Sequence, residues 1–245
     1  MSSREDFLAR IARALGRQPG QSVNNPLQGI QVPEMGPVMP PIPPGGLIAK
    51  FEEELEKVNG HAHRVASPAA LAETLQAILK SYQTRKIVLS RNPFLAQLGI
   101  PQKLQELGIT STAWPAGGDV PPDPPSGQGF REEAFSAEVG ITGADWVLAE
   151  SGTLVLTSLT EGAQIASLAP PVHVALYRSS QVVASLEEVL ERLPIAREPG
   201  AASPGRSIVF VTGVSRTADI EQILIRGVHG PRELHAILVE DSCVA

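Results

Sequence analysis

Hydrophobic residues recur along this chain with two periods, and each period predicts one kind of element. Apolar positions three and four residues apart, the spacing of an amphipathic helix, mark one set of segments: residues 3–16, 46–58, 68–82, 93–98, 101–107 and 186–193. Short runs rich in apolar and β-branched residues, which are typical of strands, mark a second set: residues 61–65, 86–90, 109–114, 145–149, 153–158, 172–177, 207–212 and 234–239.

Strands and helices alternate in the first half of the chain, which favours an α/β fold with a parallel-type sheet and helices on its faces. Two further helices are expected over residues 132–139 and 217–225, and residues 140–143 read as a turn. The pattern therefore predicts the fold class without predicting the order of the strands.

Two proline-rich tracts interrupt this pattern. Residues 17–46 contain eight prolines and little hydrophobic periodicity, and each proline fixes φ and removes a backbone donor. We therefore expect a linker there, between a detachable helix at residues 1–16 and a domain at residues 47–245. This linker should be the most protease-sensitive part of the free protein. Residues 115–129 form a second loop rich in proline and glycine.

Composition and charge narrow the class of protein. Of the 245 residues, 42% are hydrophobic and only 4% aromatic, so aliphatic side chains must fill the core. A formal net charge of −6 without clustered Lys and Arg argues against a nucleic-acid partner. The charged N-terminal segment lacks the apolar stretch of a signal peptide, and no apolar run approaches the roughly 20 residues of a membrane helix. We therefore expect a cytoplasmic protein without a membrane span.

Cysteine and motif content exclude several chemistries. Cys243 is the only cysteine, which excludes an intramolecular disulfide, a zinc finger and an iron–sulfur cluster held by this chain alone. Glycine-rich nucleotide-binding motifs and the HExxH metal motif are absent. His61 and His63 would share one face of a short strand, but the sequence offers no third ligand nearby. We expect no metal and no cofactor on this chain.

The segment GITGADWVLAESGTLVL, residues 140–156, is the first candidate for chemistry. Its two strands meet at a polar hinge formed by Glu150, Ser151, Gly152 and Thr153. A hairpin turn also needs such a glycine, whereas a carboxylate at a strand end beside hydroxyl groups can bind or react. Glu150 is therefore a catalytic candidate, and Ser151, Gly152 and Thr153 are ligand-binding candidates.

Residues 207–221 contain the second candidate site. A hydrophobic strand leads through Gly213 into an expected helix N-terminus, where free N–H groups and the helix dipole attract anions. Arg216 adds a bidentate donor for a carboxylate or phosphate. Ser215 or Thr217 would equally serve as a helix cap, with Asp219 complementing the dipole. These five residues are ligand-binding candidates; the GxSxG elbow of serine hydrolases is not met, because Thr217 replaces its last glycine.

A third segment, RGVHGPR at residues 226–232, places His229 between two glycines. A loop histidine of this kind is a candidate acid, base or ligand, and Gly230 is a binding candidate beside it. Strand ends and helix N-termini gather at one edge of an open α/β sheet. We therefore expect Glu150, the junction at residues 213–219 and His229 to converge at one end of the sheet.

Together these segments resemble one family. The runs GITGADWVLAESGTLVL, SLAPPVHVALYRSSQVV and TGVSRTADIEQILIRGVHGPRELHAILVE are similar to the LUD domain of lactate-utilisation protein C, over roughly residues 45–240. The resemblance places several residues in the family's two motifs: Thr142, Asp145, Glu150, Gly152 and Thr153 in the first, and Gly213, Ser215, Thr217, Asp219, Gly227, His229, Gly230 and Pro231 in the second. It assigns a catalytic role to none of them, and the proline-rich tracts are not part of either motif.

The resemblance implies a fold like that of the NagB/RpiA/CoA-transferase group, with three α/β/α layers and a mostly parallel central sheet. It implies a non-redox accessory subunit of a system that oxidises L-lactate to pyruvate together with iron–sulfur oxidoreductase subunits. Two alternatives stay open. One is a stand-alone enzyme of CoA-transferase or isomerase type, since residues 149–152 (AESG) resemble the glutamate nucleophile of CoA transferases. The other is a sensor of a small carboxylate or phosphate.

Overall fold

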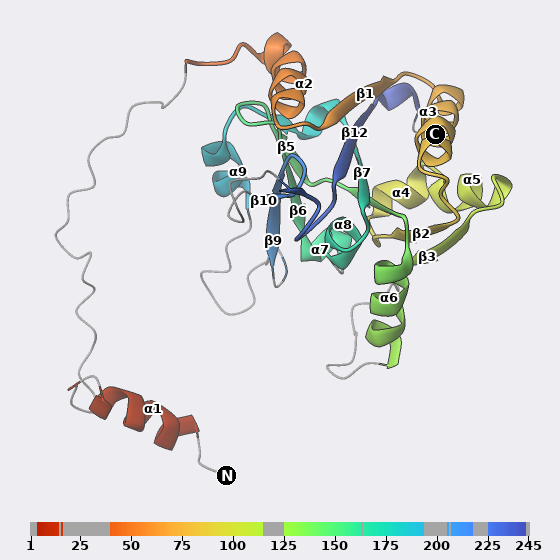
Figure 1. Ribbon diagram of the computed structural model, residues 1–245. Coiled ribbons are helices and arrows are strands. Elements are labelled where there is room, and N and C mark those ends of the chain that lie inside the picture. Colours follow the sequence, from red (N-terminus) through yellow and green to blue (C-terminus); the bar gives the residue numbers. More distant parts are fainter. Residues whose placement is uncertain are drawn as a thin grey trace. The chain divides into compact units, whose positions relative to one another are not determined.

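The computed structural model describes residues 4–14, 16, 40–114, 125–162, 164–193, 205, 207–217 and 225–243. The chain divides into two units, Met1–Pro40 and Pro41–Ala245. The first contains helix α1 (Arg4–Ala14), as its apolar spacing predicts (Figure 1). Most of the predicted linker lies outside the described residues. Its last three residues, Pro44–Gly46, are not extended but form a 3₁₀ helix that leads directly into α2 (Leu47–Lys57).

A six-stranded, wholly parallel sheet forms the centre of the second unit and confirms the predicted α/β fold (Figure 1). Its order is β1-β12-β7-β4-β2-β3. The strands span His61–Val65 (β1), Lys86–Leu89 (β2), Thr110–Ala113 (β3), Val139–Gly143 (β4), Val172–Tyr177 (β7) and Glu233–Val239 (β12). After β2 the chain moves outward to β3, whereas after β4 it moves the other way to β7. The gap between β2 and β4 is therefore a point where the topology reverses direction.

Three helices cover one face of this sheet: α3 (Pro68–Ser81), α4 (Pro93–Gln97) and α5 (Ile100–Glu106). Two of them begin at a side chain that caps the first turn. The hydroxyl of Ser67 accepts a hydrogen bond from the backbone N–H of Ala70 at 3.1 Å, and the Asn92 side chain accepts one from Phe94 N–H at 2.9 Å. Each cap satisfies a donor that the first helical turn leaves free, which fixes where the helix starts.

The opposite face carries a mixed layer. Helices α2, α6 (Pro125–Ser136) and α8 (Ile165–Leu168) contact it, beside the short α7 (Ser158–Glu161). A second sheet packs here too, in the order β8-β5-β6-β9. Its strands span Trp146–Leu148 (β5), Thr153–Thr157 (β6), Val182–Val183 (β8) and Ile208–Thr212 (β9). Helix α9 (Leu186–Arg192) covers its outer side, so part of the molecule has one layer more than predicted.

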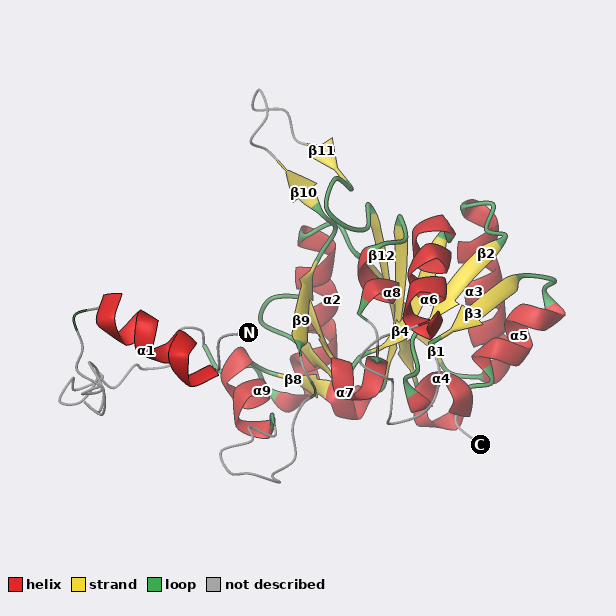
Figure 2. Ribbon diagram, turned by 90° about the horizontal axis from the view of Figure 1, so that it is seen from below, coloured by secondary structure: helices red, strands yellow, loops and turns green. Residues whose placement is uncertain are grey.

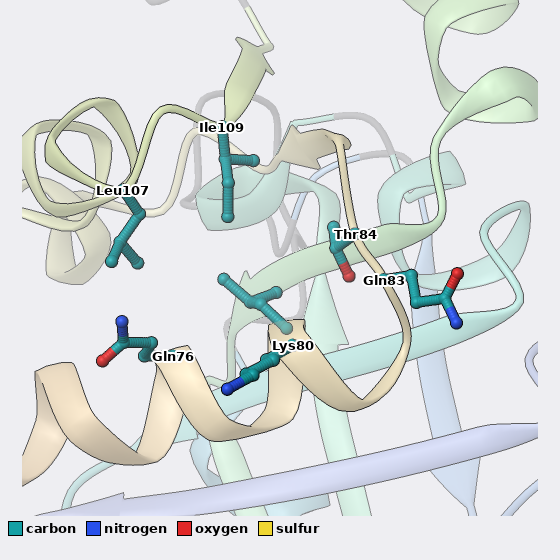
Figure 3. A pocket seen from close by; sticks show the side chains of 7 residues that line it. Gln76, Lys80, Gln83, Thr84, Leu107 and Ile109 are labelled. Carbon is teal, nitrogen blue, oxygen red and sulfur yellow. The ribbon is translucent and has the colours of Figure 1, made fainter.

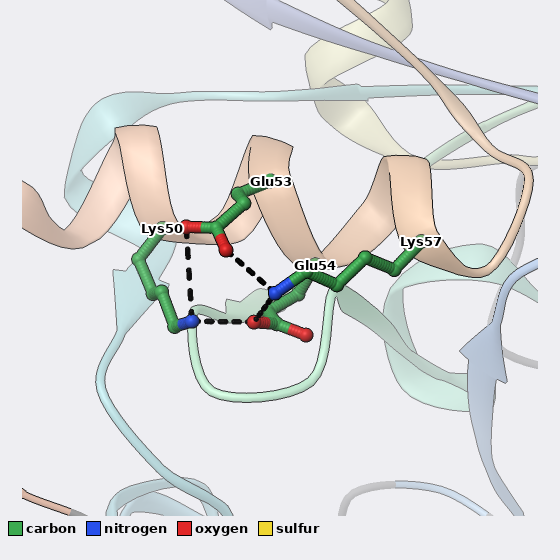
Figure 4. A network of polar contacts seen from close by, with 4 residues as sticks. All are labelled: Lys50, Glu53, Glu54 and Lys57. Atoms are coloured by element: carbon green, nitrogen blue, oxygen red, sulfur yellow. Dashed lines mark hydrogen bonds and ion pairs between the residues drawn. The ribbon is translucent and has the colours of Figure 1, made fainter.

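Helix α2 shows how this layer is patterned. Phe51 and Leu55 are fully buried, and Phe51 meets the ring of Tyr177 edge-on with centroids 5.3 Å apart. The polar side of α2 carries an ion-pair network of two lysines and two glutamates, Lys50, Glu53, Glu54 and Lys57 (Figure 4). These are surface pairs one turn apart, so the helix is held mainly by its apolar face.

The predicted turn at residues 140–143 is wrong, because these residues form the fully buried strand β4. The predicted helix 132–139 likewise starts earlier, at Pro125 within the predicted loop 115–129, and ends at Ser136. The glycines that suggested a turn serve close packing instead. A Cβ on Gly140 would lie 1.8 Å from the carbonyl oxygen of Ala166 in α8. A parallel strand buried on both faces has no polar alternation to reveal it.

The predicted helix 217–225 is also contradicted at both of its described ends. Arg216–Thr217 (β10) and Ile225–Arg226 (β11) pair as antiparallel strands, and residues 218–224 between them lie outside the described part. Figure 2 shows this hairpin extending away from the two sheets. Gly213 and Gly227, both with positive φ, flank the hairpin and turn the chain into and out of it.

Candidate functional site

Glu150, the catalytic candidate, has a structural partner. Its Oε1 accepts a hydrogen bond from the backbone N–H of Leu186 at 2.8 Å. Leu186 is the first residue of α9, and Ser185 before it makes no side-chain capping bond. The carboxylate of Glu150 therefore caps α9 and also complements the positive end of its dipole. No described contact orients it toward a substrate.

The other hinge residues form a chain of hydroxyl groups. The Ser151 and Thr153 hydroxyls lie 2.8 Å apart, and the Thr153 and Thr212 hydroxyls are also 2.8 Å apart. Thr153 and Thr212 pair in register across β6 and β9. Gly152, with φ +63°, lies so close to α2 that a Cβ would be 2.3 Å from the backbone nitrogen of Leu55. The hinge is thus packed tightly beneath α2.

The structure brings the hinge and Gly213 to the same end of the second sheet. Gly213 follows Thr212 directly, and a Cβ on it would lie 2.3 Å from the carbonyl oxygen of Val58. Val58 precedes β1, so this end of the second sheet faces the amino ends of the parallel strands. The carboxyl edge, where ligands usually bind in open α/β sheets, lies elsewhere.

Ser215 and the His229 loop are held together by three hydrogen bonds. Ser215 N–H donates to Pro231 C=O at 2.8 Å, Gly227 N–H donates to Ser215 C=O at 2.9 Å, and His229 N–H donates to the Ser215 hydroxyl at 3.4 Å. A Cβ on Gly230 would lie 3.4 Å from that of Ser215. The backbone here is held by turns and a hairpin.

No helix begins at Thr217, so the anion site predicted from a helix dipole is not formed, and Thr217 is not a helix cap. Arg216 instead faces Arg226 across the hairpin, and Arg226 donates to the Asn59 side chain at 3.2 Å. Asp219 lies outside the described residues. Of the predicted anion-binding groups, the structure therefore places the Ser215 hydroxyl against the His229 loop, whereas Arg216 is exposed and pairs with Arg226 across the hairpin.

A pocket of about 340 Å³ lies next to this loop. Gly227, Val228, His229 and Gly230 form one side, and α6, α8 and the start of β7 supply the other: Phe135, Leu168, Ala169 and Pro171. Phe135 is 65% exposed, which leaves an aromatic ring at the rim. Of the described residues that the sequence proposed as catalytic or ligand-binding, only His229 and Gly230 line this pocket. Glu150 is not part of its lining.

The paired histidines of β1 have a third histidine as neighbour, which the sequence did not suggest. His63 Nε2 lies 3.0 Å from His235 Nδ1, and His235 Nε2 lies 2.9 Å from the Tyr82 hydroxyl. β1 pairs with β12, far away in sequence, and this register brings the rings together. Burial lowers the pKa of His235 to about 3. Among the described residues, no group of three or more His, Cys, Asp or Glu side chains is placed to hold a metal ion.

The most deeply buried carboxylate among the described residues was not predicted from the sequence. Glu161 is fully buried where the topology reverses, between the carboxyl ends of β2 and β4. Its oxygens accept hydrogen bonds from the Asn92 side chain, from Gly143 N–H at 3.2 Å and from Ser90. The segment that follows β2 is thereby tied to the segment that follows β4.

Burial governs the protonation of this region. It raises the pKa of Glu161 to about 7, against the hydrogen bonds from Ser90 and Asn92, and the nearby Asp145 raises it further. Burial also raises the pKa of Asp145, although Thr157 and Thr160 donate to its Oδ2 at 2.7 and 2.9 Å. Only the strand order reveals this site, because Glu161 belongs to no recognisable motif.

The fold and these sites define a parallel α/β protein with an appended mixed sheet and a glycine-rich loop carrying His229. The family model of the LUD domain matches residues 48–239, and the chain belongs to that family. Lactate utilization protein C of Halalkalibacterium halodurans is 30% identical, covering 97% of this chain and 98% of its own length. Uncharacterized protein YkgG of Escherichia coli is 31% identical over 72% of each chain.

A solved structure supports the fold. The crystal structure of a DUF162 family protein from Deinococcus radiodurans superposes with a TM-score of 0.56, covering 81% of this chain and 99% of that one. At 22% identity the likeness concerns the arrangement of sheet and helices and carries no information on the site.

Proposed function

We propose that this protein is an accessory subunit, without a redox group of its own, of a cytoplasmic system that oxidises L-lactate to pyruvate with iron–sulfur partner proteins. The observation that carries the proposal is similarity over nearly the whole chain to proteins named lactate utilization protein C. Membership of the LUD domain family agrees with it.

The cysteine content supports a role without a cluster. Cys243 is buried, and its thiol donates to the carbonyl oxygen of Val65 at 3.6 Å. An iron–sulfur cluster takes about four cysteine thiolates. Electron transfer is therefore assigned to the partners, and this chain is assigned binding or assembly.

The pocket beside His229 is the proposed place for a small carboxylate or phosphate. The Ser215 hydroxyl lies next to the His229 loop, and Arg216 follows Ser215 directly in the chain; a hydroxyl and a guanidinium can both donate to an oxyanion. Arg216→Ala should abolish anion binding and leave the melting temperature nearly unchanged, since an exposed charge contributes little to stability. Arg226→Ala is the matched control, because Arg226 is engaged with Asn59.

Growth and capture experiments test the assignment. Deletion of the gene should abolish growth of the source organism on L-lactate but not on glucose, and the wild-type gene should restore it. Tagged protein from lactate-grown cells should capture iron–sulfur proteins, while the tagged chain purified alone should be colourless. Normal growth of the deletion strain on L-lactate would contradict the proposal. Transfer of label from an acyl-CoA to Glu150 would instead favour the CoA-transferase alternative.

A further inference from the structure

A second pocket, which shares no lining residue with the pocket beside His229, lies at the amino ends of β2 and β3. It encloses about 440 Å³ between the last turns of α3 and the loop that leads from α5 into β3 (Figure 3). Its lining combines three aliphatic side chains with four polar ones: Leu79, Leu107 and Ile109, and Gln76, Lys80, Gln83 and Thr84.

The Thr84 hydroxyl is the unusual member. Its oxygen is buried and has no hydrogen-bond partner among the described residues. A buried hydroxyl without a partner costs free energy, so proteins rarely leave one. Thr84 lies at the edge of the space that Leu107, Ile109 and Lys80 also line (Figure 3), where a bound molecule could serve as its partner.

The backbone holds Thr84 in this position. Thr84 N–H donates to Leu79 C=O at 3.0 Å, and Gln83 N–H donates to Lys80 C=O at 3.1 Å. Gln83 takes the left-handed conformation, with φ +52°, that ends α3. The closing turn thus places Thr84 in the wall of the pocket, with no partner for its hydroxyl among the described residues.

The charged side chains of the pocket lining indicate which charge a ligand would carry. Lys80 makes no ion pair within the described part of the chain, and no acidic side chain lines the pocket. The last carbonyl groups of α3 and α5 already accept backbone bonds from Gln83, Thr84, Gly108 and Ile109, so they repel an anion less than free carbonyls would. Lys80 and Thr84 are therefore donors for an anion, beside aliphatic walls.

We propose that this pocket binds a small organic acid with an apolar body. Its carboxylate would accept hydrogen bonds from Thr84 and Lys80, and its apolar part would lie against Leu79, Leu107 and Ile109. The site is separate from the His229 pocket, so it does not depend on the function proposed above.

Benzoate tests the proposal, with benzamide as its neutral isostere and acetate as the carboxylate without an apolar body. NMR titration of the full chain should shift the methyl signals of Leu107 and Ile109 with benzoate, and each of the other two probes should bind at least about tenfold more weakly. Shifts that spread over the surface, or equal binding of benzamide, would overturn it.

Two variants locate the binding groups. Lys80→Gln and Thr84→Val should each weaken benzoate binding about tenfold, whereas Lys103→Gln, which removes the same charge from α5 outside the pocket, should not. Melting curves establish that each variant is folded. Unchanged benzoate affinity in folded Thr84→Val and Lys80→Gln would overturn the assignment of these residues.

Discussion

At the carboxyl end of β2, the carboxylate of Glu161 is fully buried and accepts hydrogen bonds from Ser90, Asn92 and Gly143. At the amino end of the same strand, the buried hydroxyl of Thr84 has no partner in the described part of the chain, and Thr84 lines a pocket. The first group joins two segments of the fold, whereas the second leaves a hydrogen bond for a ligand to make. Burial alone therefore does not identify a binding site; the presence or absence of partners separates the two cases.

The largest effect on the free energy of unfolding is expected at the carboxyl end of β2, where the buried carboxylate has hydrogen-bond partners. Glu161→Ala removes the common acceptor of the Asn92 side chain and Gly143 N–H and leaves both buried without it. Each such donor costs roughly 1–3 kcal/mol, so we expect a loss of about 4 kcal/mol in the free energy of unfolding. Urea unfolding measures it. Glu132→Ala, on the exposed side of α6, is the matched control; a similarly small change in both variants would contradict a joining role.

The carboxyl group of Glu161 should also make the stability of the protein depend on pH. Burial raises the pKa of Glu161 from 4.5 to about 7, so between these values the folded protein retains a proton that the unfolded chain releases. Stability is therefore highest below pH 4.5 as far as Glu161 is concerned, and it falls as pH rises to 7. The shift corresponds to roughly 3 kcal/mol. Glu161→Gln removes this titration.

The measurement is the difference in free energy of unfolding between Glu161→Gln and wild type across this range, which should grow by about 3 kcal/mol from pH 4.5 to 7. Buried His173, whose pKa is lowered to about 4, acts in the opposite direction, because the unfolded chain takes up its proton below pH 6.5. That contribution is common to both proteins and cancels. Parallel pH curves would show that Glu161 titrates normally.

Glu150 adds a third case to this comparison: a half-buried carboxylate that accepts one hydrogen bond among the described residues. Glu150→Ala removes the acceptor of Leu186 N–H and should lower the free energy of unfolding by about 1 kcal/mol, the usual worth of a helix cap. Glu150→Gln keeps an acceptor oxygen and should cost much less. If Glu150→Gln abolishes growth on L-lactate while the protein remains stable, the carboxylate has a chemical role besides capping.

The sequence predicted the parts of this fold that local patterns determine. The strands at residues 86–90 and 172–177 and the helices at residues 68–82 and 93–98 are confirmed, because apolar runs and helical periodicity act within a few residues. The segment 140–143 was misread because its glycines allow close packing with distant parts of the chain: a Cβ on Gly140 would collide with α8, and one on Gly143 with the Asn92 side chain.

Predicting the site residues required knowledge of long-range strand pairing even more than predicting the fold did. Ser215 and His229 were predicted to lie together and do, because the paired strands β10 and β11 lie between them in the chain. Glu161 was missed because its partners Ser90 and Asn92 lie about 70 residues earlier, at the end of a strand that only the strand order brings close. His235 was missed for the same reason, since β12 had to be placed beside β1.

The smallest effect on the free energy of unfolding, opposite in sign, is expected at the amino end of β2, where the Thr84 hydroxyl has no partner among the described residues. Thr84→Val replaces a buried hydroxyl that has no partner among the described residues by a methyl group of the same shape, so without ligand it should raise the free energy of unfolding by up to about 1 kcal/mol. Thr142→Val is the matched control, because the Thr142 hydroxyl lies 2.8 Å from His173 Nε2 and its removal should destabilise the protein. Urea unfolding of both variants, measured without any organic acid, gives the two signs. A loss of stability in Thr84→Val as large as that in Thr142→Val would mean that the Thr84 hydroxyl already has a partner in the free protein, and the contrast between the two ends of β2 would no longer hold.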